Sequence, residues 1–162
     1  LLLVVPLLCF ALPPCSPYDA CAAKLTTFAM EEGSGYDPGS GEAPPLYDDL
    51  VPAPSMDYEN TLDTDTFQLC ECSDNSTCSL EFKDNQISLD QTITLAFCPG
   101  VQRSLCTSSR GLIRVMGETI LGNTEYPVTI SKALAFCQCD KYKRLPASSW
   151  ESSGLVFPYK CQ

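Results

Sequence analysis

Four short stretches in the second half of the chain carry the apolar residues of predicted β-strands, and one of them, 128–136, alternates with a period of two. These stretches are 91–97 (QTITLAF), 111–115 (GLIRV), 128–136 (VTISKALAF) and 155–159 (LVFPY). Their β-branched and aromatic residues favour strands. In the third stretch the period predicts one buried face formed by Val128, Ile130, Leu134 and Phe136. In the last stretch, Pro158 predicts an edge or irregular strand.

Cysteines follow these strands closely and predict how a small β-rich domain is held together. The chain has 11 cysteines in 162 residues, a frequency typical of secreted disulfide-bonded domains. Eight of them lie in the predicted domain at 70–162: Cys70, Cys72, Cys78, Cys98, Cys106, Cys137, Cys139 and Cys161. Eight cysteines can form four disulfides, in a pairing that the sequence does not fix.

Zinc is the alternative use of these cysteines. The two Cys-x-Cys pairs lack the spacing of zinc knuckles, and there is no histidine, so we expect disulfides and neither a metal nor another cofactor. Cys15 and Cys21 precede this region. We expect them to pair with each other or with a partner chain.

The first residues form an apolar run, LLLVVPLLCFAL at 1–12. The run is too short for a membrane span, which needs about 20 residues, and it has the length of a signal-peptide core. We therefore interpret 1–20 as part of a signal peptide, cleaved after Ala11 or after Ala22. Cys9 would leave with it, and a secreted protein with no membrane insertion is expected.

The net charge of −10 comes from one stretch, 27–66, which contains no lysine or arginine. Its acids are Glu31, Glu32, Asp37, Glu42, Asp48, Asp49, Asp57, Glu59, Asp63 and Asp65. With its prolines and glycines, this composition predicts a disordered acidic segment over 21–69 that precedes the β-rich domain. Such a charge disfavours nucleic acid and anionic membranes as partners and favours an extracellular protein with a basic surface.

The acidic segment carries three candidate roles. One is a solvated spacer. A second is a contact strip with sulfated tyrosines, because Tyr36, Tyr47 and Tyr58 have acidic neighbours and resemble sulfation substrates. A third is attachment of glycosaminoglycan chains at Ser34 or Ser40, each followed by glycine among acids.

Other chemistry is sparse in the sequence. Asn75 begins an Asn-Ser-Thr sequon and is a candidate glycosylation site. A small basic cluster follows Cys139 at Lys141, Lys143 and Arg144. The absence of histidine excludes Ser-His-Asp and Cys-His catalysis. The carboxylates of the domain form no catalytic motif, and we expect a protein that is not an enzyme.

The cysteine order over 69–162 is similar to a secreted cysteine-rich family of arthropods. The features shared are Cys-x-Cys, Phe97-Cys98-Pro99, the strand GLIRVMG, Phe136-Cys137-Gln138-Cys139 and the closing Tyr159-Lys160-Cys161. They resemble the eleventh group of centipede scoloptoxins. The resemblance implies a secreted, non-enzymatic binding protein, a venom or salivary effector in its sharper form. The alternatives are an endogenous extracellular ligand and a glycan-bearing matrix component.

Overall fold

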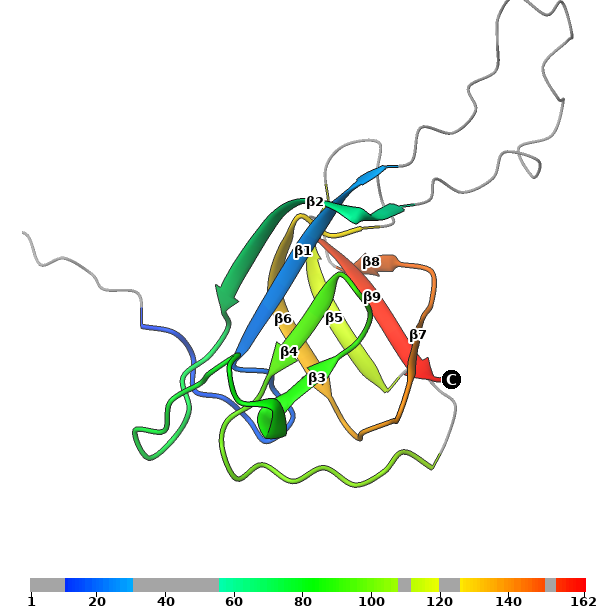
Figure 1. The fold of residues 1–162 in the computed structure, drawn as a ribbon. Coiled ribbons are helices and arrows are strands. Elements are labelled where there is room, and N and C mark those ends of the chain that lie inside the picture. The colour runs from blue at the N-terminus through cyan, green and yellow to red at the C-terminus, as the bar shows by residue number, and fades with distance from the viewer. Residues whose placement is uncertain (1–10, 31–55, 108–111, 120–125, 151–153) are drawn as a thin grey trace, which may run out of the picture.

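A computed structural model describes residues 11–30, 56–107, 112–119, 126–150 and 154–162, and it consists of two antiparallel sheets (Figure 1). The first sheet has the order β2 (Met56–Gln68), β1 (Ala22–Met30), β4 (Ile93–Ala96) and β3 (Gln86–Ser88). The second has the order β6 (Thr129–Ala135), β5 (Ile113–Glu118), β9 (Gly154–Cys161) and β7 (Tyr142–Arg144), with β8 (Ser148–Trp150) also paired to β9. The short helix η2 (Lys83–Asn85) precedes β3, and no helix in the described ranges is long and apolar enough to cross a bilayer.

The two sheets share one hydrophobic core. A single cluster of buried residues takes side chains from β1, β3 and β4 of the first sheet and from β5, β6 and β9 of the second. Its largest fully buried members include Tyr159, Phe97, Phe157, Ile93 and Leu95. Burial of aromatic and branched side chains between two sheets stabilises each by about 1.5–3 kcal/mol. The prediction of a small, disulfide-rich β domain is confirmed.

All four stretches predicted from the sequence contain a strand, but the predicted face of the third is wrong. Ile130 is buried, whereas Val128 and Phe136 are exposed, and Ala133 and Ala135 are buried instead. The register with β5 shifts between Ile130 and Lys132, so that Ser131 has no partner and the alternation changes phase. A bulge of this kind cannot be seen in a period-two pattern.

Gly117 makes this bulge sterically possible. It pairs with Ile130, and a Cβ on it would collide with the backbone carbonyl oxygen of Thr129. β5 and β6 therefore approach more closely at this point than any residue with a side chain would allow.

Of the two alternatives predicted for the strand of Pro158, an edge strand is wrong, because β9 pairs with β5 on one side and with β7 and β8 on the other. The carbonyl oxygen of Pro158 accepts a hydrogen bond from the N–H of Leu145, in the turn between β7 and β8. The carbonyl of Tyr159 faces the other way, toward Leu112 before β5. The proline nitrogen thus points at the gap between β7 and β8, where no ladder hydrogen bond is lost.

The predicted boundary at Cys70 is wrong as well. β1 and β2 lie inside the predicted disordered segment 21–69, and they pair over the length of β1. β1 occupies the middle of the first sheet, and Ala22, Ala23 and Leu25 are buried. Residues 31–55 lie outside the described residues. The folded domain therefore includes both ends of the segment that was predicted to be disordered.

Residues 11–20, which were assigned to the signal peptide, are also part of this fold. Pro14 forms a bridge with Glu71, and Asp19 forms one with Leu134 of β6. Ala20 is buried and donates its N–H to the carbonyl of Ala133. Cleavage after Ala22 would remove these contacts and two disulfide-bonded cysteines, so that predicted site is wrong. Residues 1–10 and Cys9 lie outside the described residues.

All ten described cysteines form disulfides, and only three of the five bonds lie within 70–162. The pairs are Cys15–Cys70, Cys21–Cys78, Cys72–Cys98, Cys106–Cys137 and Cys139–Cys161. The predicted pairing of Cys15 with Cys21 or with a partner chain is therefore wrong. Each Cys-x-Cys pair reaches two different neighbours, as its spacing suggests.

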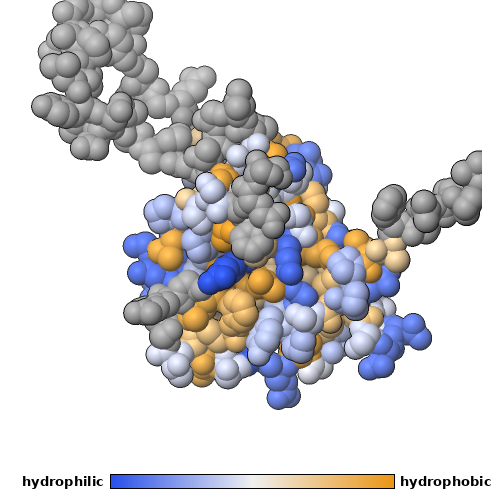
Figure 2. All heavy atoms as spheres, turned by 180° about the vertical axis from the view of Figure 1, so that it is seen from behind, coloured by the Kyte–Doolittle hydropathy of each residue, from blue (hydrophilic) through white to orange (hydrophobic). Residues whose placement is uncertain are grey.

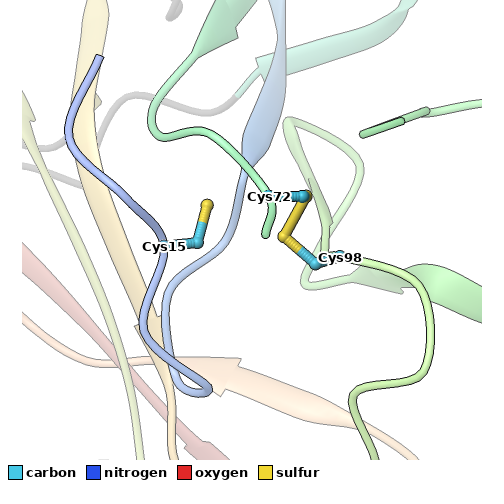
Figure 3. Close-up of side chains that lie close together, drawn as sticks. All are labelled: Cys15, Cys72 and Cys98. Carbon is cyan, nitrogen blue, oxygen red and sulfur yellow. A yellow bond between two sulfur atoms is a disulfide. The ribbon is translucent and has the colours of Figure 1, made fainter. Parts of the chain in front are cut away.

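The disulfides gather in two groups. The Sγ atom of Cys15 lies within 4.8 Å of those of Cys72 and Cys98, which bond to each other (Figure 3). At the other end of the chain, Cys139 Sγ lies 3.4 Å from Cys106 Sγ. Because these sulfurs are disulfide-bonded in the structure, they are not thiolates available to a metal.

Candidate binding edge

Exposed apolar residues are scattered over the described surface. The most exposed are Leu62 on β2, Phe82 before η2 and Leu105 before Cys106, so they lie on three separate elements. On the face opposite to that of Figure 1, apolar and polar residues are interspersed (Figure 2). The most uniform described feature is instead the edge of the first sheet formed by β2.

β2 is a long strand with one strand partner in the described part of the chain. It spans 13 residues, Met56–Gln68, and pairs with β1 alone. Threonines at 64 and 66 favour extended backbone, and Phe67 anchors the end of the strand against the core. Nearly all of the remaining side chains of β2 are exposed. One side of β2 therefore presents backbone groups at a sheet edge.

Two hydrogen bonds identify which residues of β2 face outward. The N–H of Leu69 donates to the carbonyl of Cys21, which directs residues 65, 67 and 69 toward β1. On β1, the N–H of Thr26 donates to Thr92, beside β4, which directs residues 23 and 25 toward β2. Because backbone direction alternates along a strand, the N–H and C=O groups of Thr64, Thr66 and Gln68 point away from β1.

Four carboxylates follow the same strand: Asp57, Glu59, Asp63 and Asp65. Among the described residues, no lysine or arginine lies within salt-bridge distance of them, and the ion pair found there joins Arg144 to Asp90. Asp63 Oδ1 accepts a 2.8 Å hydrogen bond from the N–H of Thr64, one of the outward-facing groups. This edge therefore combines backbone donors and acceptors with negative charge.

The first half of β2 carries an aromatic contact. Tyr58, a predicted sulfation site, is 48% exposed and packs edge-on against Phe28 of β1, with ring centroids 5.1 Å apart. Two register shifts between β1 and β2 lie in this region, around Phe28. Across these shifts, β2 has more residues than the facing part of β1, so the residues around Tyr58 bulge out of the pairing with β1.

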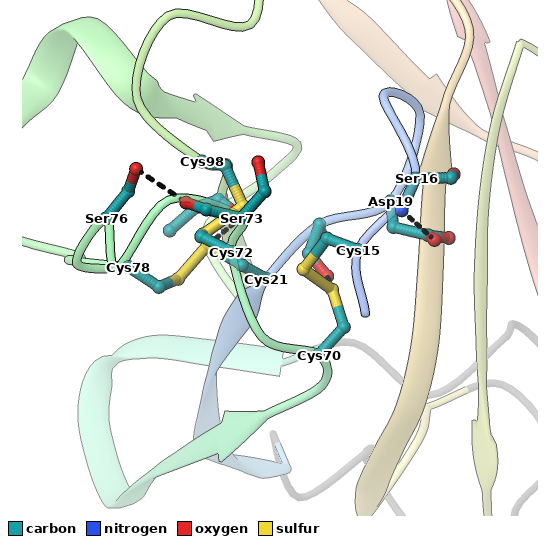
Figure 4. The surroundings of a disulfide bond; sticks show 12 residues. Cys15, Ser16, Asp19, Cys21, Cys70, Cys72, Ser73, Ser76, Cys78 and Cys98 are labelled. Atoms are coloured by element: carbon teal, nitrogen blue, oxygen red, sulfur yellow. Dashed lines mark hydrogen bonds between the residues drawn. A yellow bond between two sulfur atoms is a disulfide. The ribbon is translucent and has the colours of Figure 1, made fainter. Parts of the chain in front are cut away.

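A depression of about 470 Å³ lies at the other end of β2. Its lining includes Leu12, Gln68, Glu71 and Asn75. The loop that closes it is fixed at both ends by disulfides, Cys72–Cys98 and Cys21–Cys78 (Figure 4). The edge of β2 thus leads into a concave and chemically mixed surface.

The glycosylation candidate Asn75 is exposed in this loop. Asp74 and Asn75 have positive φ angles of 58° and 55°, which their side chains tolerate better than most. The turn is closed by Ser76, whose N–H and hydroxyl both donate to the carbonyl of Ser73 (Figure 4). The side chain of Asn75 is therefore accessible, and a glycan there would stand beside the end of β2.

The structure divides the predicted basic cluster. Lys141 and Lys143 are exposed, but Arg144 is largely buried and donates from Nη2 to Asp90 Oδ2 at 2.9 Å and to Thr92 Oγ1 at 2.8 Å. Tyr159 completes the network by donating its hydroxyl hydrogen to Asp90 and accepting a hydrogen bond from Arg144 Nε, each at 2.8 Å. The prediction of a three-residue basic surface is therefore wrong.

This network joins the two sheets. Asp90 lies between β3 and β4, whereas Arg144 and Tyr159 lie on β7 and β9. Burial opposes the charge on Asp90, but Arg144 and the hydrogen bonds from Thr92 and Tyr159 outweigh it and hold the pKa of the carboxyl below its usual value. Burial raises the pKa of Tyr159. The carboxylate of Asp90 thus serves to hold the two sheets together through its contacts with Arg144, Thr92 and Tyr159.

The remaining predicted residues are not brought to the edge by the structure. Tyr36, Tyr47, Ser34 and Ser40 lie outside the described residues. Sequence reasoning missed the outward-facing residues of β2, although a signal existed: threonine recurs at every second position, at 64 and 66, opposite Asp63, Asp65 and Phe67. The acidic composition of the region obscured that pattern.

Comparison with known proteins gives little guidance. No family model matches the chain, and no curated protein matches its sequence. Among solved structures, the chain is similar to the crystal structure of unliganded Argos, with a TM-score of 0.48 and 18% sequence identity. The match covers 93% of this chain and 57% of that one. This chain therefore spans little more than half the length of that protein.

Proposed function

We propose that the protein is a secreted, non-enzymatic binding protein that contacts a basic surface of an extracellular protein through β2. The observation that carries this proposal is the exposed edge strand with four carboxylates, none of them ion-paired within the described residues. Negative charge along such an edge accelerates encounter with a positive surface and selects against acidic partners. The aromatic ring of Tyr58 adds contact area at the same edge.

Secretion is supported by the five disulfides, because such bonds persist in oxidising compartments. The apolar run at 1–12 and the exposed sequon at Asn75 fit the same route. Glycosylation of Asn75 and sulfation of Tyr58 are part of this proposal. Both modifications are tested by comparing the intact mass of the secreted protein with the masses of its Asn75→Gln and Tyr58→Phe variants.

A non-enzymatic role is supported by the placement of the carboxylates in the domain. Asp90 is held in an ion pair with Arg144 and accepts hydrogen bonds from Thr92 and Tyr159. Asp19 is half-buried, and its Oδ2 accepts a hydrogen bond from the N–H of Ser16. Glu71, Glu81, Asp84, Glu118 and Asp140 are exposed, where their carboxylates lack the burial that tunes a catalytic acid.

The sharper form of the proposal is a venom or salivary effector, and it rests on the resemblance of the cysteine order over 69–162 to that of centipede scoloptoxins. Expression of the transcript tests this form. Restriction to a venom or salivary gland is expected, whereas broad expression would favour an endogenous ligand or matrix component.

The binding proposal is tested with two charge variants of the full chain. In the first, the four acids of β2 become amides: Asp57→Asn, Glu59→Gln, Asp63→Asn and Asp65→Asn. In the control, four exposed acids outside β2 become amides: Glu81→Gln, Asp84→Asn, Glu118→Gln and Asp140→Asn. The two variants have equal net charge, so they separate a local effect from a general one.

Each protein is immobilised and probed by surface plasmon resonance with a panel of basic and acidic secreted proteins and receptor ectodomains. The expected result is a basic partner whose binding is lost in the β2 variant and retained in the control. Equal loss in both variants, or no binding partner among the basic proteins, would overturn the proposal.

A further inference from the structure

The geometry points to a specific mode of contact: an extended, lysine- or arginine-bearing segment of the partner adds to the first sheet as a fifth strand, alongside Thr64–Gln68 of β2. This inference rests on the proposed function, and it states which atoms make the contact. It assigns the main role to the backbone of β2, and a supporting role to the carboxylates.

The backbone of β2 is arranged for such pairing. The outward N–H and C=O groups of Thr66 and Gln68 and the outward C=O of Thr64 have no hydrogen-bond partner among the described residues. The N–H of Thr64 is held by the carboxylate of its neighbour Asp63. The outward groups of Thr66 and Gln68 are not covered in this way, so an incoming strand can approach them to the usual inter-strand distance of about 4.7–4.9 Å.

The charge of β2 identifies the occupant. A second copy of this chain would bring a strand with the same acids, Asp63 and Asp65, to this edge, and like charges on adjacent strands are destabilising. The neighbouring sequence at 31–55 contains acids and no lysine or arginine, so it offers no complementary charge either. An extended basic segment of another protein can pair with the backbone of β2 and also complement the negative charge of its carboxylates.

The end of the edge adds a side-chain site. Beyond Gln68 the edge reaches the depression lined by Leu12 and Glu71. Leu12 is 38% exposed and Glu71 is exposed. A lysine or arginine of the added strand could lay its aliphatic stem on Leu12 and direct its charge to Glu71. The recognised segment is therefore about five to six residues long, since each residue of a strand spans about 3.4 Å.

Proline substitution separates backbone pairing from charge. The N–H of Thr66 faces outward, so Thr66→Pro removes no hydrogen bond to β1, leaves the net charge unchanged and blocks an added strand. Thr66→Val is the matched control, because it keeps the N–H and the β-branched shape. Gln68→Pro and Gln68→Val form a second pair at the next outward position, used if Thr66→Pro fails to fold by circular dichroism.

The probe is a fluorescent seven-residue peptide of alternating lysine and threonine, blocked at both ends, and its binding to the full disulfide-bonded chain is measured by fluorescence anisotropy. The proline variants are expected to bind it at least about tenfold more weakly, and the valine variants as well as the unchanged chain. Asp63→Asn with Asp65→Asn is expected to weaken binding too.

The outcomes distinguish this inference from the function on which it rests. If the proline variants bind normally and the asparagine variant does not, strand addition is overturned and acidic recognition stands. If the peptide does not bind the unchanged chain, strand addition is likewise overturned. A concentration-dependent dimer in sedimentation that Thr66→Pro abolishes would assign the edge to a second copy and overturn the choice of occupant.

Discussion

Replacing Arg144 by methionine tests whether the buried ion pair fastens the two sheets together. The change removes the hydrogen bonds from the guanidinium to Asp90, Thr92 and Tyr159. It keeps most of the length and apolar volume of the side chain. Asp90 would remain ionised in a largely buried position without its counter-charge, which is the costly way to break such a pair.

The structure sets the magnitude of this effect. The side chains of Arg144 and Asp90 are 18% and 31% exposed. Breaking a fully buried pair costs about 3–5 kcal/mol, and the partial exposure of Asp90 places this case at about 3 kcal/mol. For a chain of this size, that loss corresponds to a fall in Tm of about 6–12 °C.

The assay is urea unfolding with the disulfides intact, followed by circular dichroism. Lys143→Met is the matched control, because Lys143 is the exposed neighbour on the same strand, and it is expected to change stability by less than about 0.5 kcal/mol. Adding Asp90→Asn to Arg144→Met should recover part of the loss, because no buried charge is then left alone. Equal stability of Arg144→Met and Lys143→Met would refute this reasoning.

Three further predictions concern stability. Burial opposes the charge on Asp90, but Arg144 outweighs it and lowers the pKa of the carboxyl. The stabilisation by this carboxylate is therefore present above about pH 4 and is lost as the pH falls through the lowered pKa. In urea titrations below about pH 4, the Asp90→Asn variant should lose less stability with falling pH than the unchanged chain does. Replacing Cys21 and Cys78 together by alanine opens a loop with a sequence separation of 57 and should cost about 4 kcal/mol in urea unfolding, whereas a loss below about 1 kcal/mol would argue against this pairing. Gly117→Ala should lower stability by about 1–3 kcal/mol in thermal unfolding, because the new methyl group meets the carbonyl of Thr129, and an unchanged Tm would contradict the close approach of β5 and β6.

The sequence predicted the elements that depend on local pattern. The stretches that became β4, β5, β6 and β9 carry apolar and β-branched residues that are buried wherever the sheets meet, so their strand character could be recognised. β1 and β2 could not be recognised in the same way, because the exposure of β2 and its acids resemble the composition of a disordered segment. What orders β2 is its pairing with β1 and the anchor at Phe67, and both depend on tertiary structure.

The candidate site was predictable in its chemistry but not in its geometry. The clustering of acids and Tyr58 is visible in the sequence, and it led to the expectation of a basic partner. The outward direction of Thr66 is set by the register with Lys24, and no local property of the chain specifies that register. The disulfides Cys15–Cys70 and Cys21–Cys78 join segments 55 and 57 residues apart, which spacing alone does not reveal.

The most direct test of the account is amide hydrogen exchange along β2, measured by NMR on the full chain with and without the lysine–threonine peptide. The outward amides of Thr66 and Gln68 are predicted to exchange quickly in the free protein and to become protected when the peptide is added. The inward amides of Asp65 and Phe67 should be protected in both states and serve as the internal control. Unchanged exchange at Thr66 and Gln68 under saturating peptide would contradict the claim that this edge is the binding surface.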